Sequence, residues 1–128
     1  MNKIINLVDM GFCTLWRGNI LRLPAKWPYE DVVDFMIYES QDEERPYGLI
    51  VTSGQKAGLI LTLLPVESVA ADSGGLSVRW VVDNWGGWIY PECDVSDVYL
   101  VDGYKADWPV VGGISNGRKS GEKGKRGR

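Results

Sequence analysis

The side chains that could do chemistry in this chain of 128 residues are carboxylates and two cysteines, because the sequence contains no histidine. Histidine is the commonest base near neutral pH, so a serine or cysteine nucleophile would lack its usual partner. Cys13 and Cys93 lie 80 positions apart, and two cysteines without histidine cannot supply the four ligands of a typical zinc site. The sequence has no glycine-rich phosphate loop. It therefore predicts neither a metal site nor a cofactor.

Pairs of carboxylates remain as candidates for acid–base chemistry of the kind that glycosidases use. Asp31 with Asp34 and Glu92 with Asp94 are the pairs that could be proposed. Their spacing of three residues or fewer, in segments expected to be loops, is more typical of solvated surface charge. A carboxylate-dependent hydrolase is therefore only the third interpretation, after the two binding functions given below.

Charge divides the chain into two unequal parts. Residues 1–117 contain 16 Asp and Glu against 8 Lys and Arg, a net charge of −8, whereas residues 118–128 contain 6 basic residues and one Glu, a net charge of +5. The acidic residues of the body form three clusters: Glu30, Asp31 and Asp34; Glu39, Asp42, Glu43 and Glu44; and Glu92, Asp94 and Asp97 with Asp102. An acidic surface speeds the encounter with a basic partner by roughly 10- to 10³-fold.

The same acidic body argues against nucleic-acid binding. Six Trp could form stacking platforms, but such platforms are normally combined with a positively charged groove. A net charge of −8 repels phosphate, so we expect no direct nucleic-acid binding by the body. Trp16, Trp80 and Trp85 are instead expected to lie in the core.

Alternation of apolar and polar residues predicts a mostly-β fold of the α+β class, with a single antiparallel, strongly twisted sheet or a partial barrel. Residues 35–39 and 47–52 predict a hairpin with an acidic connection. Residues 59–64 are apolar on both faces and predict a central third strand. Further short strands are predicted over three ranges: residues 14–16, 19–23 and 95–101.

One segment departs from this alternation. Apolar residues at spacings of three and four predict about one helix over residues 77–86, with Ser77 as its N-cap and Gly86 and Gly87 ending or interrupting it. The β-branched residues in this segment leave a strand as the alternative.

The chain is expected to form one domain over residues 1–111, followed by a flexible basic tail over residues 112–128 that is rich in Gly, Lys and Arg. The apolar run near the N-terminus is broken by Asp9 and is too short for a signal peptide. No stretch approaches the roughly 18 apolar residues of a membrane span. We therefore expect a cytoplasmic protein that does not associate with membranes.

Two short motifs resemble those of a bacterial family. Trp16-Arg17-Gly18 is a Trp-x-Gly motif and Tyr90-Pro91-Glu92-Cys93 is a Tyr-x-x-Cys motif, and with their surroundings they resemble immunity protein family 45 of the polymorphic toxin systems. The resemblance implies a mostly-β domain that binds and neutralises the toxin encoded by the preceding gene, and it does not imply an enzyme. We interpret the motif residues as structural: Gly18 permits a tight turn, and Trp16, Tyr90 and Cys93 are buried.

The toxin contact is predicted in acidic loops that carry an aromatic side chain. The residues in this prediction are Asp42, Glu43 and Glu44, the pair Glu30 and Asp31, and Trp27 or Tyr29 as the exposed anchor. Such a surface could occlude the active site or substrate groove of a basic toxin, for example a nuclease. The alternative function is a small β-barrel adaptor that binds a basic peptide or protein through an aromatic and acidic surface.

Overall fold

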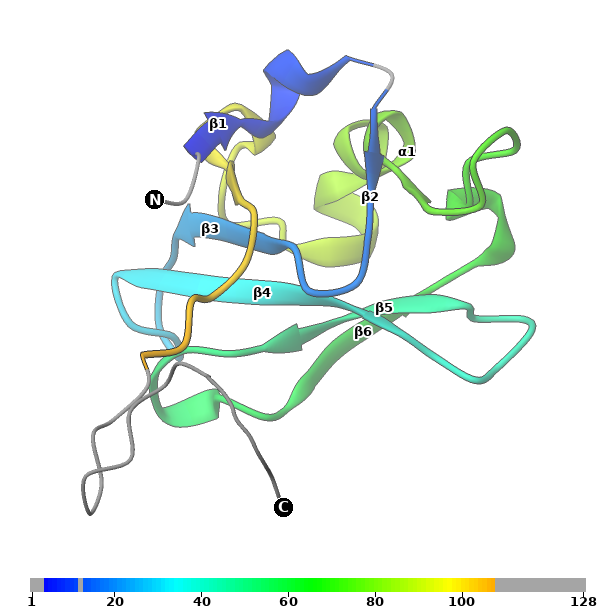
Figure 1. Ribbon diagram of the computed structural model, residues 1–128. Helices are drawn as coiled ribbons and strands as arrows, with labels where there is room; N and C mark the ends of the chain where they lie inside the picture. Colours follow the sequence, from blue (N-terminus) through cyan, green and yellow to red (C-terminus); the bar gives the residue numbers. More distant parts are fainter. Residues whose placement is uncertain (1–3, 12, 108–128) are drawn as a thin grey trace, which may run out of the picture.

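The computed structural model describes residues 4–11 and 13–107, and its main element is an antiparallel sheet of six strands in the order β1-β8-β3-β4-β5-β6 (Figure 1). The strands of this sheet are β1 (Ile4–Asn6), β3 (Ile20–Pro24), β4 (Val32–Glu39), β5 (Tyr47–Val51), β6 (Ile60–Leu64) and β8 (Tyr99–Val101). A second sheet pairs β2 (Thr14–Leu15) with β7 (Leu76–Ser77). The mostly-β prediction is confirmed. The six-stranded sheet does not close into a barrel, since β1 and β6 are its two edge strands.

The predicted meander of three antiparallel strands is present as β4, β5 and β6. However, β6 lies at the edge of the sheet, and the prediction of a central strand is wrong. Leu59 and Ile60 at its start are each 56% exposed. Apolar side chains occupy both faces of most strands, as in the cross-strand row formed by Ile20, Met36 and Ile50. Apolar residues on both faces therefore do not distinguish a central strand from an edge strand here.

A helical layer packs on the inner face of the sheet (Figure 1). The predicted helix forms as α1 (Val78–Asp83), and the Ser77 hydroxyl caps it by accepting a hydrogen bond from the Trp80 backbone N–H (3.1 Å). Gly86 and Gly87 lie in a following π-helical turn, η4 (Trp85–Ile89), so the helical path continues beyond them. The Tyr90 N–H closes this turn on the Trp85 carbonyl (3.0 Å).

Four 3₁₀ turns complete the described chain. They are η1 (Leu7–Met10), η2 (Gly54–Lys56), η3 (Val66–Ser68) and η5 (Val95–Asp97). The last turn shortens the strand predicted over residues 95–101, because the Asp94 carboxylate accepts hydrogen bonds from the Ser96 N–H and hydroxyl and starts a turn there (2.9 and 2.8 Å). β1 was not predicted; it pairs with β8 at the other edge of the sheet.

The core lies between the inner face of the sheet and the layer formed by α1 and η4. Of the three tryptophans expected there, only Trp85 is fully buried, and its indole N–H donates to the Cys93 carbonyl (3.0 Å). Trp80 is partly buried, and Trp16 is 47% exposed, so the expectation of a buried Trp16 is wrong. Trp16 follows the last residue of β2 and precedes the turn at Gly18.

The basic tail predicted over residues 112–128 lies outside the described residues. Within residues 4–11 and 13–107, no helix has the length and apolar character needed to cross a bilayer.

Candidate functional site

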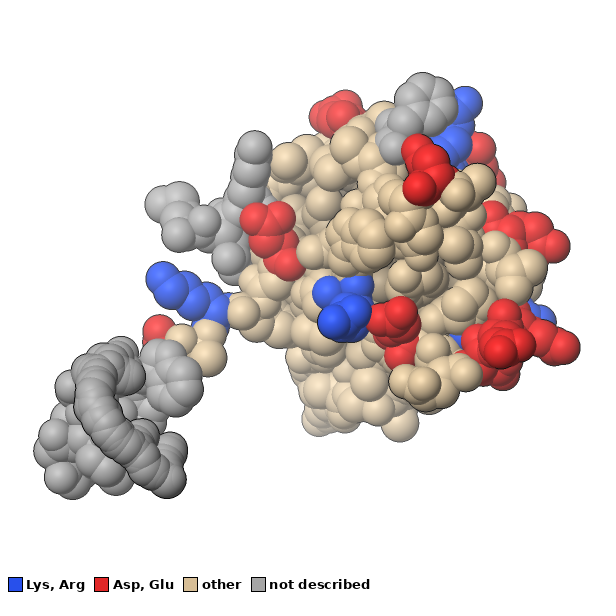
Figure 2. Space-filling model, turned by 45° about the vertical axis from the view of Figure 1, so that its right-hand side comes forward, with Lys and Arg blue, Asp and Glu red and all other residues tan. Residues whose placement is uncertain are grey.

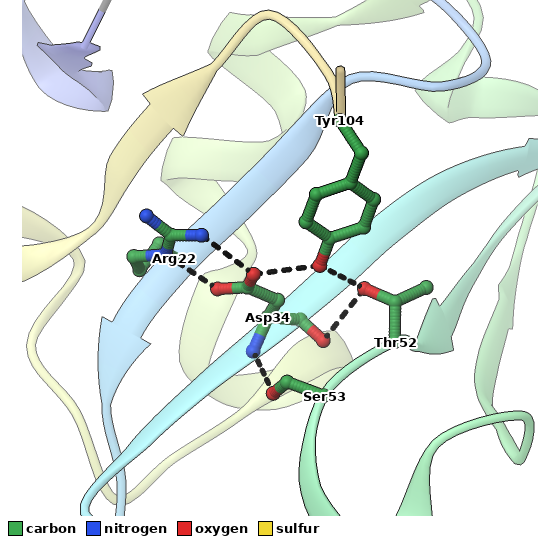
Figure 3. Close-up of polar contacts among 5 residues, drawn as sticks. All are labelled: Arg22, Asp34, Thr52, Ser53 and Tyr104. Carbon is green, nitrogen blue, oxygen red and sulfur yellow. Dashed lines mark hydrogen bonds and ion pairs between the residues drawn. The ribbon is translucent and has the colours of Figure 1, made fainter. Parts of the chain in front are cut away.

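Among residues 4–11 and 13–107, the buried charged side chain is Asp34, which lies on the outer face of β4 at the centre of a polar network (Figure 3). Its carboxylate accepts two hydrogen bonds from the Arg22 guanidinium (2.7 and 2.8 Å) and one from the Tyr104 hydroxyl (2.6 Å). The Asp34 backbone N–H donates to the Ser53 hydroxyl (2.9 Å), and Thr52 shares a hydrogen bond with Tyr104 (2.7 Å). This network ties the segment that follows β8 to the sheet.

The electrostatics of Asp34 do not suit acid–base catalysis. Burial by itself would raise the pKa of Asp34, but the hydrogen bonds from Arg22 and Tyr104 and the charge of Arg22 outweigh it, so the pKa lies below its ordinary value. Hydrogen bonds from Ser96 likewise lower the pKa of Asp94. Asp34 and Asp94 are therefore held in the ionised form, whereas a general acid needs a raised pKa, so neither of these two carboxyls suits that role.

The residues predicted to contact a partner do not form one surface. Asp42, Glu43 and Glu44 lie in the β4–β5 connection, and the second group, Trp27, Tyr29, Glu30 and Asp31, lies in the β3–β4 connection. Figure 1 shows these two connections at opposite ends of β4. The eight residues of β4 separate them by roughly 26 Å at about 3.3 Å per residue. We therefore treat the hairpin end and the Trp27 end as two separate candidate surfaces.

At the Trp27 end, two of the predicted contact residues have structural contacts within the chain. Tyr29 is partly buried and packs edge-on against Phe35 and Tyr90, with ring centroids 6.0 and 5.9 Å away, so it is not an exposed anchor. Glu30 accepts a hydrogen bond from the Gln55 N–H (3.1 Å), which lowers its pKa and holds η2 against this loop. Trp27 is 90% exposed.

A small hollow of about 140 Å³ lies beside this loop, lined by Pro24, Ala25, Lys26, Glu92, Cys93, Asp94 and Asp97. Burial raises the pKa of the Cys93 thiol, and the charges of Asp97 and Asp94 raise it further, so the thiol is a poor nucleophile. In the part of the chain that the structure describes, no three acidic or cysteine side chains come together as metal ligands. The hollow is an acidic depression that holds one lysine.

At the hairpin end, the connection between β4 and β5 is ordered by its own residues. The Asp42 carboxylate accepts a hydrogen bond from the Glu44 N–H (2.8 Å). The Arg45 guanidinium lies 5.4 Å from the centre of the Trp88 ring and donates a long hydrogen bond to the Leu63 carbonyl (3.4 Å). The hairpin is therefore fixed against η4 and the edge strand β6.

The carboxylates of this hairpin are available to a partner. Glu43 and Glu44 are exposed, and their side chains form no ion pair or hydrogen bond within the described residues. Figure 2 shows acidic side chains spread over this side of the molecule, with the densest group at its right-hand edge and no single continuous patch. The free acidic charge is thus distributed, and charge alone does not locate a binding surface.

Trp88, which we did not predict as a site residue, lies beside this hairpin. Its ring contacts that of Trp80 at a centroid distance of 5.7 Å, and 38% of its surface is exposed. Gly86 and Gly87 precede it in η4 and are both exposed. The sequence signal for this surface was the run Trp85-Gly86-Gly87-Trp88, in which two glycines interrupt an apolar helical pattern.

The four motif residues lie in separate local structures. Gly18 adopts φ +91° in the turn before β3, a conformation that favours glycine. Tyr90 and Cys93 are buried, and the Tyr90 hydroxyl accepts a hydrogen bond from the Lys26 N–H (3.0 Å). Trp16 is the exposed member, and its backbone N–H donates to the Asn19 side chain (3.0 Å).

Comparison with known protein families identifies one that covers most of the chain. The model of the family described as Immunity protein 45 matches residues 7–100. Neither a curated protein nor a solved structure matches the chain significantly.

Proposed function

Since the chain belongs to the Immunity protein 45 family, we propose that it binds a basic toxin domain made by the same bacterium and neutralises it by covering the toxin's active site or substrate groove. The protein acts by binding and transforms no substrate. It works inside the producing cell, where the toxin would otherwise act.

The observation that carries this proposal is the excess of unpaired acidic charge. The body has a net charge of −8, and ion pairs such as Arg17–Glu39 and Arg22–Asp34 leave Glu43 and Glu44 without a cation among the described residues. An acidic surface attracts a basic protein from a distance and disfavours like-charged competitors. Toxins that cut nucleic acid bear basic grooves, which an acidic inhibitor can fill.

Growth rescue tests the proposed neutralisation. The toxin domain encoded by the preceding gene is expressed with and without this protein, and we expect growth only when both are present. Purified proteins should form a complex whose association rate falls steeply between low salt and about 0.5 M salt, because salt screens charges beyond a few ångströms. Continued toxicity with both proteins present and folded would refute neutralisation. A salt-independent association rate would refute the basic partner.

A pair of charge-reversal variants tests the acidic surface at each end. One variant carries Asp42→Lys, Glu43→Lys and Glu44→Lys, and the other carries Asp31→Lys, Glu92→Lys and Asp97→Lys. Both raise the net charge by the same amount, so any difference in association rate reports location and not total charge. We expect at least one of them to slow association by about tenfold. Unchanged rates in both variants would remove electrostatic attraction from the mechanism.

A further inference from the structure

Gly86 and Gly87 differ from the other glycines of the described chain. Five others have a positive φ, which favours glycine: Gly11, Gly18, Gly54, Gly58 and Gly74. Three more lie where an added Cβ would come within 3.2 Å of another atom: Gly48, Gly75 and Gly103. At Gly86 and Gly87 φ is not in the left-handed region, and a Cβ would meet nothing within 4 Å. The chain's own conformation and packing therefore do not require glycine at these two positions.

Glycine without such a reason is costly in a helical turn. It loses more backbone freedom on folding than alanine does, and it leaves the backbone exposed to water. Gly86 and Gly87 also lie in a π-helical turn, a rare conformation that is frequent at functional sites. A position that lowers the stability of the free protein, and that packing does not explain, is expected where another molecule comes close.

We propose that the toxin docks on the surface formed by Glu43, Glu44, Arg45, Gly86, Gly87 and Trp88, which we call the Trp88 surface. A basic segment of the toxin lies flat against the two glycines and the exposed edge of Trp88. Its cations pair with Glu43 and Glu44. This inference rests on the proposed function and adds to it the face that binds.

The arrangement of the Trp88 surface fits an interface with a basic protein. The exposed edge of Trp88 gives an apolar centre, the two glycines beside it let a partner come close to the backbone, and the hairpin carboxylates give a charged rim. Arg45 is held over the Trp88 ring, so the nearest in-chain cation is already engaged. The same contact fixes the hairpin before binding, which lowers the entropic cost of association. A second copy of this chain would bring the same carboxylates and be repelled.

The surface at the Trp27 end is a less suitable docking site for a basic protein. Its Glu30 and Asp94 carboxylates already accept hydrogen bonds within the chain, and Lys26 lines the hollow between its acidic residues. Trp27 is exposed by itself, and single exposed apolar side chains are common on protein surfaces.

The test uses substitutions that add one methyl group at a time. Gly86→Ala and Gly87→Ala should leave the unfolding temperature unchanged or raise it by a few degrees, since alanine is the better residue in a helical turn. The same variants should bind the toxin domain encoded by the preceding gene about tenfold more weakly, mainly through faster dissociation. Gly87→Ser and Gly87→Gln should weaken binding progressively with side-chain size.

Gly58→Ala is the matched control. It also adds a methyl group in open space, but at φ +99° and in the β5–β6 connection. It should lower the unfolding temperature and leave toxin affinity unchanged, the reverse of the result expected at Gly86 and Gly87. The control therefore shows whether a loss of stability by itself weakens toxin binding.

The outcomes distinguish this inference from the proposed function. If the wild-type protein binds the toxin, Gly86→Ala and Gly87→Ala bind equally well, and Trp27→Ala binds weakly, then the toxin contact lies at the Trp27 end and our inference is wrong. If the glycine variants abolish a concentration-dependent dimer of the free protein instead, the occupant is a second copy. If the wild-type protein does not bind the toxin at all, the proposed function itself fails.

Discussion

Replacing Asp34 with asparagine should destabilise the fold and leave toxin binding intact. Asp34 is only 4% exposed, and its carboxylate accepts three hydrogen bonds, two from Arg22 and one from Tyr104. Asparagine has nearly the same size but carries no charge, and its NH₂ group would face donors. About two charge-assisted hydrogen bonds are lost, each worth roughly 1.5–3 kcal/mol. Because the Arg22 side chain is 42% exposed, water replaces part of the lost hydrogen bonding. We therefore expect the free energy of unfolding to fall by about 2–3 kcal/mol.

This loss is large enough to measure by ordinary unfolding experiments. For a domain of this size, about 2–3 kcal/mol corresponds to a fall in unfolding temperature of roughly 10 °C. Tryptophan fluorescence in urea gives the free energy of unfolding, and Tyr104→Phe provides the control because it removes one donor and should cost about 1 kcal/mol. Asp34→Leu with Arg22→Leu should be less destabilised than the sum of the two single variants.

Two results would refute this reasoning. An Asp34→Asn protein that unfolds at the wild-type temperature would show that the network does not stabilise the fold. A folded Asp34→Asn protein that fails to bind or neutralise the toxin would show that Asp34 has a direct functional role, and it would reopen the carboxylate-dependent interpretation.

Three further predictions concern pH, thiol chemistry and helix capping. Because the folded-state pKa of Asp34 is lowered, its stabilisation is complete above the unfolded pKa near 3.9 and is lost as pH falls through the folded value. Acid unfolding curves should therefore be shallower below pH of about 4 in Asp34→Asn than in the wild type. A thiol reagent near neutral pH should label exposed Cys13 and spare buried Cys93 until the protein unfolds, as mass spectrometry can show; rapid labelling of Cys93 would contradict its burial. Ser77→Ala should cost about 1 kcal/mol in urea unfolding because α1 loses its N-cap, and an unchanged midpoint would mean that the cap adds nothing.

Local patterns in the sequence were enough to predict the main elements of the fold. The hairpin from β4 to β5 and the capped helix α1 depend on periodicity and on Ser77, which act within a few residues. The position of β6 at the sheet edge depends on which strands pair with it. Apolar residues on both of its faces do not predict that pairing. The prediction that Trp16 is buried was wrong because it also depends on tertiary structure. An aromatic side chain at the end of a strand is buried only if another element packs over it.

The separation of the two acidic loops could have been inferred from the sequence. A predicted strand over residues 35–39 lies between Asp31 and Asp42, and an extended chain moves its ends apart by about 3.3 Å per residue. The sequence did not show that the side chains of Glu30 and Tyr29 make contacts within the chain. Their roles come from Gln55 and Tyr90, which are distant in sequence and are brought close only by the folded sheet.

Acidity and location answer different questions about this protein. Long-range electrostatic attraction depends on the charge of the whole surface. The net charge of −8 therefore favours a partner of positive net charge and raises the association rate, but it does not indicate the position of the binding site. Location depends on short-range contacts, which are sensitive to a single methyl group. Carboxylates on a solvated loop lower the stability of the fold very little, so their presence there is weak evidence for a binding site. Glycines in an open helical turn do cost stability, and for that reason Gly86 and Gly87 are the stronger evidence for where the partner lies.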